Sequence, residues 1–138
     1  MKNIIHCADA IMVYEETGEL VLIERLDSGR LALPGGKLES GEVAVEAVVR
    51  EVLEETGLDF TPVSELGLYD EPGRDPRGEY ASTVFVGTGC GSPHDETGKT
   101  KVVFMDLDSF ESWKHRLAFD HAKIIGDHLK SVYANPAH

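Results

Sequence analysis

The chain has 138 residues, 41% of them hydrophobic, a length that suits one ordinary globular domain with one core. Its 13 basic and 25 acidic residues give a formal net charge of -12, which disfavours binding to nucleic acids or anionic membranes. The two cysteines, Cys7 and Cys90, lie far apart without metal-ligand spacing, and nothing resembles the dense cysteine framework of a small secreted domain, so we expect a cytoplasmic protein.

The N-terminal third predicts strands. Met1 to His6 contains no apolar leader, and no stretch of the chain approaches the roughly 20 apolar residues of a membrane span. Apolar and β-branched residues at Cys7 to Tyr14 and at Leu20 to Ile23 flank the polar segment Glu15 to Glu19. This pattern predicts a hairpin.

A second pattern predicts a helix. The short apolar run Leu31 to Leu33 ends at Pro34-Gly35-Gly36, which predicts a constrained loop. Apolar residues at helical spacing then run from Val43 to Thr56. Ser40 is a candidate N-cap and Gly57 a C-terminal stop.

The remaining chain predicts a sheet followed by helices. Four further strands are expected, at Leu58 to Val63, Leu66 to Tyr69, Tyr80 to Val86 and Val102 to Asp106. Gly87 to Thr100 contains four glycines and a proline and predicts a long surface loop. We expect helices at Ser109 to Arg116 and Asp120 to Tyr133, the latter with Ala122, Ile124, Ile125, Leu129 and Val132 available for burial. Helices before and after a sheet favour a mixed α/β layer architecture.

Three glutamates are expected on one face of the helix that starts at Val43. If Glu51 defines zero on a helical wheel, Glu54 falls at roughly -60 degrees and Glu55 at roughly +40. Ala44 and Ala47 fall roughly within 40 degrees of Glu51, which predicts space for a ligand. The residues predicted to anchor the helix lie on an adjacent stripe: Val45, Val48, Val49 and Val52.

Carboxylates at this spacing repel one another, and a bound cation would offset the repulsion. Oxygen ligands suit hard divalent ions, and Mg²⁺ in particular keeps several waters and bridges to phosphates. Such an ion would also let an acidic protein bind an anionic substrate. Arg50 could orient Glu51 through a bidentate pair. A solvated acidic helix face would show the same three glutamates.

The residues around the three glutamates favour the metal hypothesis. From Gly36 to Leu58 the sequence is GKLESGEVAVEAVVREVLEETGL. It resembles the Nudix box, G-x5-E-x7-R-E-U-x-E-E-x-G-U with U a bulky aliphatic residue, at every specified position. A chance match at a given start has a probability on the order of one in a billion.

The resemblance implies an α/β fold, the Nudix α/β/α sandwich around a mixed sheet, spanning residues 1–138 as a single domain. It implies a pyrophosphohydrolase that uses Mg²⁺, with Mn²⁺ as a substitute, on a nucleoside diphosphate linked to another group. Glu51 and Glu55 would be principal metal ligands, Glu54 a further ligand and Gly36 a carbonyl ligand. Arg50 would orient Glu51, and Glu42 would have a structural pairing role.

The general base is left open by the sequence. Members of this family take it either from the glutamate cluster, here Glu54 or Glu55, or from a flexible loop. Asp95 and Glu96 are loop candidates for a base or an extra ligand, and Asp95 also for contact with substrate. His94 is a titratable alternative. We favour Glu96, although a charged loop that only aids solubility predicts the same residues.

Two short fragments resemble ADP-ribose pyrophosphatases of the family. They are Gly73-Arg74-Asp75-Pro76-Arg77-Gly78 and Leu117-Ala118-Phe119-Asp120-His121. They imply that Arg74 or Arg77 contacts the diphosphate or terminal ribose. A type I turn at Asp75 to Gly78 and a helix cap at Asp120 would account for the same residues. Three aromatic residues could stack on a base or belong to the core: Trp113, Phe119 and Tyr80.

ADP-ribose, or a related ADP-sugar, is therefore the expected substrate, with AMP and a sugar phosphate as products. A sanitising pyrophosphohydrolase for modified nucleoside triphosphates is an alternative with the same metal site. A non-catalytic Nudix module that senses nucleotide sugars is another, which the intact glutamates disfavour. The family resemblance also allows a homodimer.

Overall fold

A computed structural model describes residues 3–134 of the chain. Met1 and Lys2, which begin the segment expected to lack a leader, lie outside the described residues. The strands are β1 (Ile5–Tyr14), β2 (Leu20–Arg25), β3 (Leu31–Ala32), β4 (Gly35–Lys37), β5 (Asp59–Tyr69), β6 (Tyr80–Cys90) and β7 (Thr100–Met105). The α-helices are α1 (Ala44–Thr56), α2 (Phe110–Trp113) and α3 (His121–Ala134), and 3-10 turns at Leu107–Ser109 and Lys114–Arg116 flank α2.

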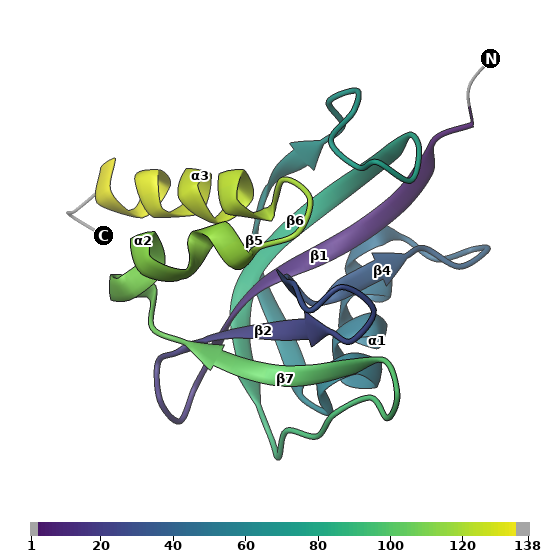
Figure 1. The fold of residues 1–138 in the computed structure, drawn as a ribbon. Helices are drawn as coiled ribbons and strands as arrows, with labels where there is room; N and C mark the ends of the chain where they lie inside the picture. Colours follow the sequence, from purple (N-terminus) through teal and green to yellow (C-terminus); the bar gives the residue numbers. More distant parts are fainter. Residues whose placement is uncertain (1–2, 135–138) are drawn as a thin grey trace.

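The strands form one mixed sheet. Five of them follow the order β3-β2-β1-β6-β5, while β4 pairs with β1 and β7 pairs with β2. The central pair β1 and β6 is parallel, and the remaining pairs are antiparallel. Helix α1 covers one face of the sheet, and α2 and α3 cover the other (Figure 1). The predicted α/β/α sandwich with a mixed sheet is therefore confirmed.

Alternation along β1 explains the two cores. Ala8, Ala10 and Met12 point to one face and pack with Val48 and Val52 of α1. Ile11 points to the other face, where the core also contains Ile124 and Ile125 of α3. A central strand buried on both faces holds its residues in a fixed register, so it can carry polar groups at defined depths.

Helix α1 begins four residues after the predicted cap. Its N-cap is Val43, and the side chain of Glu46 accepts a hydrogen bond of 3.1 Å from the Val43 amide. The prediction of Ser40 as cap is wrong, because Ser40 and Gly41 lie in the turn that precedes the helix. The predicted stop is confirmed: Gly57 is left-handed, and its amide donates to the carbonyl of Leu53.

Two loops predicted from their glycines are wholly or partly strands in the structure. The segment after Pro34 forms strand β4 instead of a loop, and β6 continues through Gly87 and Gly89 to Cys90. A Cβ at Gly87 would lie 2.0 Å from the carbonyl oxygen of Thr61, and one at Gly89 would lie 2.4 Å from the Met12 sulfur. These glycines allow close packing within the sheet, so only residues 91–99 form the loop.

Other strands and helices also differ from their predicted bounds. The two strands predicted between Leu58 and Tyr69 are one strand, β5, which carries irregularities near Val63 and Leu66. The helix predicted from Ser109 is broken into the 3-10 and α turns around α2. On α3, Ile124 and Ile125 are buried and Leu129 packs against their core, but Val132 is exposed, so its predicted burial is wrong.

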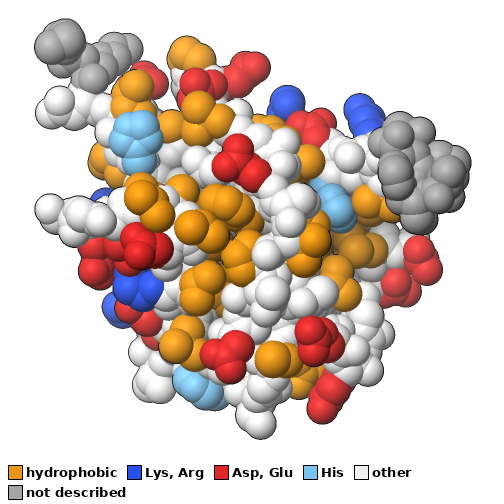
Figure 2. Space-filling view, turned by 180° about the vertical axis from the view of Figure 1, so that it is seen from behind, with side chains coloured by type: hydrophobic (Ala, Val, Ile, Leu, Met, Phe, Trp, Pro, Cys, Tyr) orange, Lys and Arg blue, Asp and Glu red, His pale blue; other side chains and the backbone are white. Residues whose placement is uncertain are grey.

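Part of the surface is apolar. Large hydrophobic side chains are exposed on α1 and β5, among them Val45, Val49, Leu53, Val63 and Leu68. Seen from behind, hydrophobic side chains gather over the middle of the molecule (Figure 2). Within the described part of the chain, no helix has the length and apolar character needed to cross a bilayer.

Candidate active site

A cavity of about 450 Å³ opens where β1, β2 and β4 meet the C-terminal end of α1. Residues 96–100, the segment 74–80 and Phe119 complete its walls. Charged side chains of both signs line it: Arg25, Lys37, Arg74, Arg77 and Lys99, with Asp9, Asp27, Glu55, Asp75 and Glu96. A concave site with arginines beside carboxylates suits an anionic ligand that is bound together with a cation.

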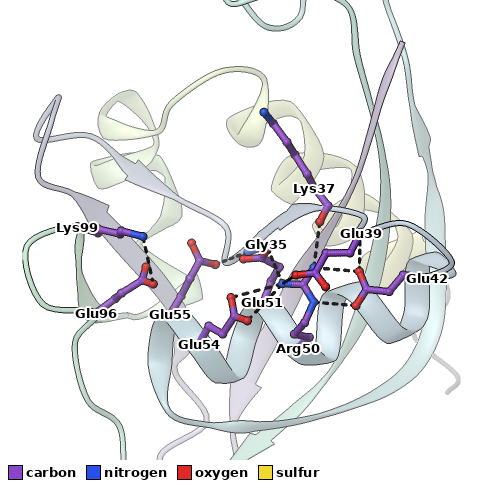
Figure 3. A network of polar contacts seen from close by, with 10 residues as sticks. All are labelled: Gly35, Lys37, Glu39, Glu42, Arg50, Glu51, Glu54, Glu55, Glu96 and Lys99. Atoms are coloured by element: carbon purple, nitrogen blue, oxygen red, sulfur yellow. Dashed lines mark hydrogen bonds and ion pairs between the residues drawn. The ribbon is translucent and has the colours of Figure 1, made fainter. Parts of the chain in front are cut away.

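Glu51, Glu54 and Glu55 form an acidic stripe along α1, and Glu55 is its most buried residue. Only 9% of it is exposed, and its Oε1 accepts a hydrogen bond of 2.7 Å from the amide of Gly35 (Figure 3). Burial, and then the negative charges of Glu51, Asp9 and Glu96, raise its pKa to about 8. Glu55 is thus a carboxylate whose charged form lacks a compensating cation.

Glu51 occupies the next turn towards the N-terminus of α1. A Cβ at Gly36 would lie 2.5 Å from the carboxylate carbon of Glu51, so only glycine leaves room for this side chain. Burial raises the pKa of Glu51 as well. Strand β4 therefore runs directly along the acidic stripe, with Gly35 against Glu55 and Gly36 against Glu51.

The sequence predicted that the glutamates and the packing residues of α1 lie on separate faces, and this prediction is wrong. Ala47 is fully buried in the core, and not beside a ligand space, whereas Val45 and Val49 are exposed by 39% and 37%. Glu55 is buried like Ala47 and Val48 and lines the cavity, which reaches between helix and sheet. Glu51 lies against Gly36 and is not part of the cavity wall. Glu54 is at the margin, with half of its side chain exposed.

Arg50 connects the acidic residues (Figure 3). Its Nε and one terminal nitrogen donate to the carboxylate of Glu42 at 2.7 and 2.9 Å, and its other terminal nitrogen donates to Glu51 at 2.9 Å. Longer bonds of 3.4 Å reach Glu54. The hydrogen bonds from Arg50 lower the pKa of Glu42 to about 2. This supports a pairing role for Glu42 and an orienting role for Arg50.

The donor set fits a hard divalent cation. Glu51, Glu54 and Glu55 offer only carboxylate oxygens, the type of ligand that Mg²⁺, Mn²⁺ and Ca²⁺ take. Among residues 3–134, no three acidic, histidine or cysteine side chains are close enough together to hold a metal by themselves. A cation here would take other ligands from water, backbone or substrate, as Mg²⁺ does at phosphate sites.

The three loop candidates for the base lie in different environments. Glu96 lines the cavity, 30% of its side chain is exposed, and Lys99 lies 3.9 Å from it. Asp95 instead accepts a hydrogen bond of 2.8 Å from the Val102 amide and is not part of the cavity wall. The ring of His94 lies against Gly57, at the end of α1. Of the three, only Glu96 faces the site.

The two arginine candidates for substrate contact, Arg74 and Arg77, differ in their exposure to solvent. Arg74 makes two hydrogen bonds of 2.7 and 2.8 Å to Asp120, and only 6% of its side chain is exposed. Arg77 pairs with Asp75 at 2.7 Å, but 47% of its side chain is exposed. The Gly78 amide donates to the Asp75 carbonyl at 3.3 Å, which closes a turn at the predicted place, and the Asp75 side chain accepts from the Arg77 amide. Arg77 can therefore reach a ligand, whereas Arg74 fixes the segment that contains Asp120.

The aromatic candidates separate in the same way. Trp113 belongs to the core, where its Nε1 donates to the carbonyl of Asp106. Tyr80 and Phe119 line the cavity. The guanidinium of Arg77 lies 4.8 Å from the Tyr80 ring centre and 4.7 Å from that of Phe119. Both rings are thus part of a cationic wall.

Sequence reasoning missed a buried polar group beside Glu55. Asp9 on β1 is 8% exposed, and the hydroxyl of Ser82 on β6 donates to it at 2.5 Å. Burial raises the pKa of Asp9 and lowers that of His121, whose Nδ1 accepts from the Leu33 amide at 3.0 Å. The one available signal was a charged residue inside an apolar strand.

Comparisons with known proteins match this chain over most of its length. A model of the NUDIX domain family matches residues 5–127. The ADP-ribose pyrophosphatase of Methanocaldococcus jannaschii is 42% identical over 122 residues, which cover 86% of this chain and 70% of that protein.

Two solved structures share the fold. The NUDIX domain of Shewanella oneidensis NrtR complexed with ADP ribose is 20% identical, with a TM-score of 0.81 over 96% of this chain and 90% of that one. A bifunctional NMN adenylyltransferase/ADP ribose pyrophosphatase from Francisella tularensis, complexed with AMP and an Mn ion, is 24% identical with a TM-score of 0.82. This second likeness covers 95% of this chain but only 42% of that chain.

Proposed function

The chain belongs to the NUDIX domain family, and from this premise we propose that it hydrolyses ADP-ribose, or a closely related ADP-sugar, to AMP and a sugar phosphate. The observation that carries the proposal is the cavity itself, in which Glu55 of α1 and arginines line one space, with Glu51 next to it on the helix. The 42% identity to an ADP-ribose pyrophosphatase supports the choice of substrate.

We assign the cation to the acidic stripe of α1. Glu51 and Glu55 would be its principal side-chain ligands, Glu54 a further ligand and Gly36 a carbonyl ligand, with Mg²⁺ as the proposed ion and Mn²⁺ as a substitute. Bound there, a divalent ion neutralises diphosphate oxygens and lowers the pKa of a water molecule. The unbalanced negative charge around Glu55 supports this assignment.

Other residues of the chain orient these ligands and bind the substrate. Arg50 holds Glu51 through one nitrogen while Glu42 anchors its other side, so the carboxylate of Glu51 keeps one direction. Arg77 contacts the diphosphate or the terminal ribose, because its guanidinium is exposed and can bind phosphate oxygens in a bidentate way. Tyr80 and Phe119 border the space for the nucleoside and hold Arg77 over their rings.

Glu96 is the proposed general base. It comes from the loop before β7, on a different element from the proposed metal ligands of α1, and it lines the cavity together with Glu55. In that position it can accept the proton of the attacking water while the glutamates of α1 remain bound to the cation. Asp95 supports the loop through its bond to Val102.

Product analysis tests the proposal. The protein with Mg²⁺ is incubated separately with ADP-ribose and with an oxidised nucleoside triphosphate, and products are separated chromatographically. We expect AMP and ribose 5-phosphate in equal amounts from ADP-ribose. Rapid turnover of the triphosphate without AMP from ADP-ribose would favour the sanitising alternative. Tight ADP-ribose binding without any turnover would favour the sensing alternative.

A further inference from the structure

A second, smaller cavity adjoins the proposed active site. It has a volume of about 220 Å³ and shares Arg25, Asp27, Arg77 and Phe119 with the larger one. Its remaining walls come from Ser28, Arg30, Pro76 and Ala118. Because four residues line both cavities, a ligand that fills the first can extend a group into the second.

This smaller cavity, here called the outer cavity, is lined by more basic than acidic residues although the protein is acidic overall. Three arginines line it, and Asp27 is the only carboxylate among its lining residues. Arg25 pairs with Asp27 at 3.1 Å, and Arg77 pairs with Asp75 at 2.7 Å. The cavity therefore has one arginine more than these two carboxylates can neutralise.

Arg30 is that remaining arginine. Within residues 3–134 it makes no ion pair with a carboxylate. Its hydrogen bonds, of 3.4 and 3.5 Å, go to the backbone carbonyls of His115 and Leu117. These bonds place the guanidinium at the cavity wall without neutralising its charge.

Phe119, which lines both cavities, has an unusual backbone conformation. It is the one residue other than glycine in the described part of the chain with a positive φ, 54 degrees, a conformation that costs free energy for a bulky side chain. Its neighbours hold it there, since the Ala118 amide donates to the Leu31 carbonyl and Asp120 is paired with Arg74.

The guanidinium carbons of Arg25 and Arg77 lie 5.2 and 4.7 Å from the Phe119 ring centre. The Phe119 ring thus holds the two arginines that line both cavities.

We infer that the outer cavity binds a phosphomonoester on one ribose of the substrate, so that the enzyme prefers a ribose-phosphorylated ADP-ribose to ADP-ribose itself. This inference rests on the proposed function. A phosphomonoester has close to two negative charges at pH 7 and three acceptor oxygens, which match several guanidinium donors. A ribose hydroxyl has no charge and would gain much less than a phosphate from the exposed guanidinium of Arg30. The surplus arginine therefore points to a second anionic group beyond the diphosphate.

Steady-state kinetics on three substrates test the inference. We compare ADP-ribose with ADP-ribose 2′-phosphate, phosphorylated on the adenosine ribose, and ADP-ribose 1″-phosphate, phosphorylated on the terminal ribose. We expect the KM of one phosphorylated compound to be lower than that of ADP-ribose by about tenfold, the size of one charged hydrogen bond. The compound that gains affinity identifies which end of the substrate reaches the outer cavity.

Variants of Arg30 separate charge from structure. Arg30→Gln should abolish most of the preference for the phosphorylated compound, and Arg30→Lys should retain part of it. Arg116→Gln is the matched control, because Arg116 lies outside both cavities and pairs with Glu24 at 3.5 Å. Thermal unfolding of each variant checks that the fold is intact.

Two outcomes would overturn the inference. Either neither phosphorylated compound has a lower KM than ADP-ribose, or Arg30→Gln raises all three KM values equally. In both cases ADP-ribose would still be hydrolysed, so the proposed function would stand. If the wild-type protein consumes none of the three compounds, the proposed function fails first.

Discussion

The amide of Gly35 donates a hydrogen bond of 2.7 Å to the carboxylate of Glu55, and this bond joins β4 to the metal-binding face proposed for α1. The next residue of the strand, Gly36, lies against the carboxylate of Glu51. The chain thus aligns its glutamates against a backbone that has no side chains in the way.

The charge of Glu55 should make the metal-free protein less stable at high pH. Its pKa is about 8 in the folded protein against an ordinary value of 4.5, so the folded state binds more protons between these values. The free energy of unfolding must therefore fall as pH rises from 4.5 towards 8. Glu55→Gln removes this contribution, and in chelator it should be more stable than wild type by a few kcal/mol at pH 9.

Denaturant unfolding at pH 5 and pH 9 measures this difference. The two proteins should have nearly equal stability at pH 5, where Glu55 is protonated in the folded state. Groups far from Glu55 titrate alike in both proteins, so the difference between them reports Glu55 together with its repulsion by Glu51, Asp9 and Glu96. A constant difference across this range would contradict the burial of a carboxylate at this position.

Gly36→Ala should crowd Glu51. The added Cβ would lie 2.5 Å from the carboxylate carbon, which forces the side chain away from β4. We expect the apparent metal affinity to fall by about tenfold, as when a supporting contact of a metal ligand is lost. Gly67→Ala is the control, because its Cβ would meet nothing within 4 Å. Equal metal dependence of the two variants would argue against Glu51 as a ligand.

Arg50→Lys should lower turnover by about ten- to a hundredfold. A lysine ammonium keeps the charge, but it cannot donate at once to Glu42, to Glu51 and to the carbonyl of Lys37, as the guanidinium does. Arg116→Lys, at the exposed pair with Glu24, should leave kcat within a fewfold range of wild type. Initial rates at saturating Mg²⁺ give the comparison. An unchanged kcat in Arg50→Lys would show that charge alone suffices.

Glu96→Gln should lower kcat by about a hundredfold or more with little change in KM, because it removes the proposed base but keeps the shape of the side chain. Asp95→Asn, one residue away, keeps an oxygen for the Val102 amide and should change kcat much less. If Asp95→Asn were the more damaging variant, the base would have to be sought elsewhere, first among Glu54 and Glu55.

The helical placement of the acidic residues could be predicted from the sequence, but the partners that surround them could not. The spacing of Glu51, Glu54 and Glu55 and the stop at Gly57 follow from helical periodicity and from local backbone preferences, which act over a few residues. The partners of these residues depend on pairing between distant strands. Asp9 and Ser82 are 73 residues apart in the chain. They come into contact only because β1 and β6 are parallel neighbours in the sheet.

The same limit explains the misjudged helix face. A helical wheel shows that Val45 and Val49 share one side of α1 and that Ala47 lies on another. It does not show which side faces the sheet or where the cavity begins. Glycine was ambiguous for a similar reason. Gly87 and Gly89 look like turn residues, and their need for space appears only once β5 and Met12 are in place.

The most direct test of the central claim is a calorimetric titration of the chelator-treated protein with Mn²⁺, with and without AMP, on wild type and Glu55→Gln. We predict saturable binding to the wild type that AMP strengthens, and at least tenfold weaker binding to Glu55→Gln, together with loss of ADP-ribose hydrolysis. Equal binding of Mn²⁺ by both proteins, or none by the wild type, would contradict a metal site on the acidic face of α1.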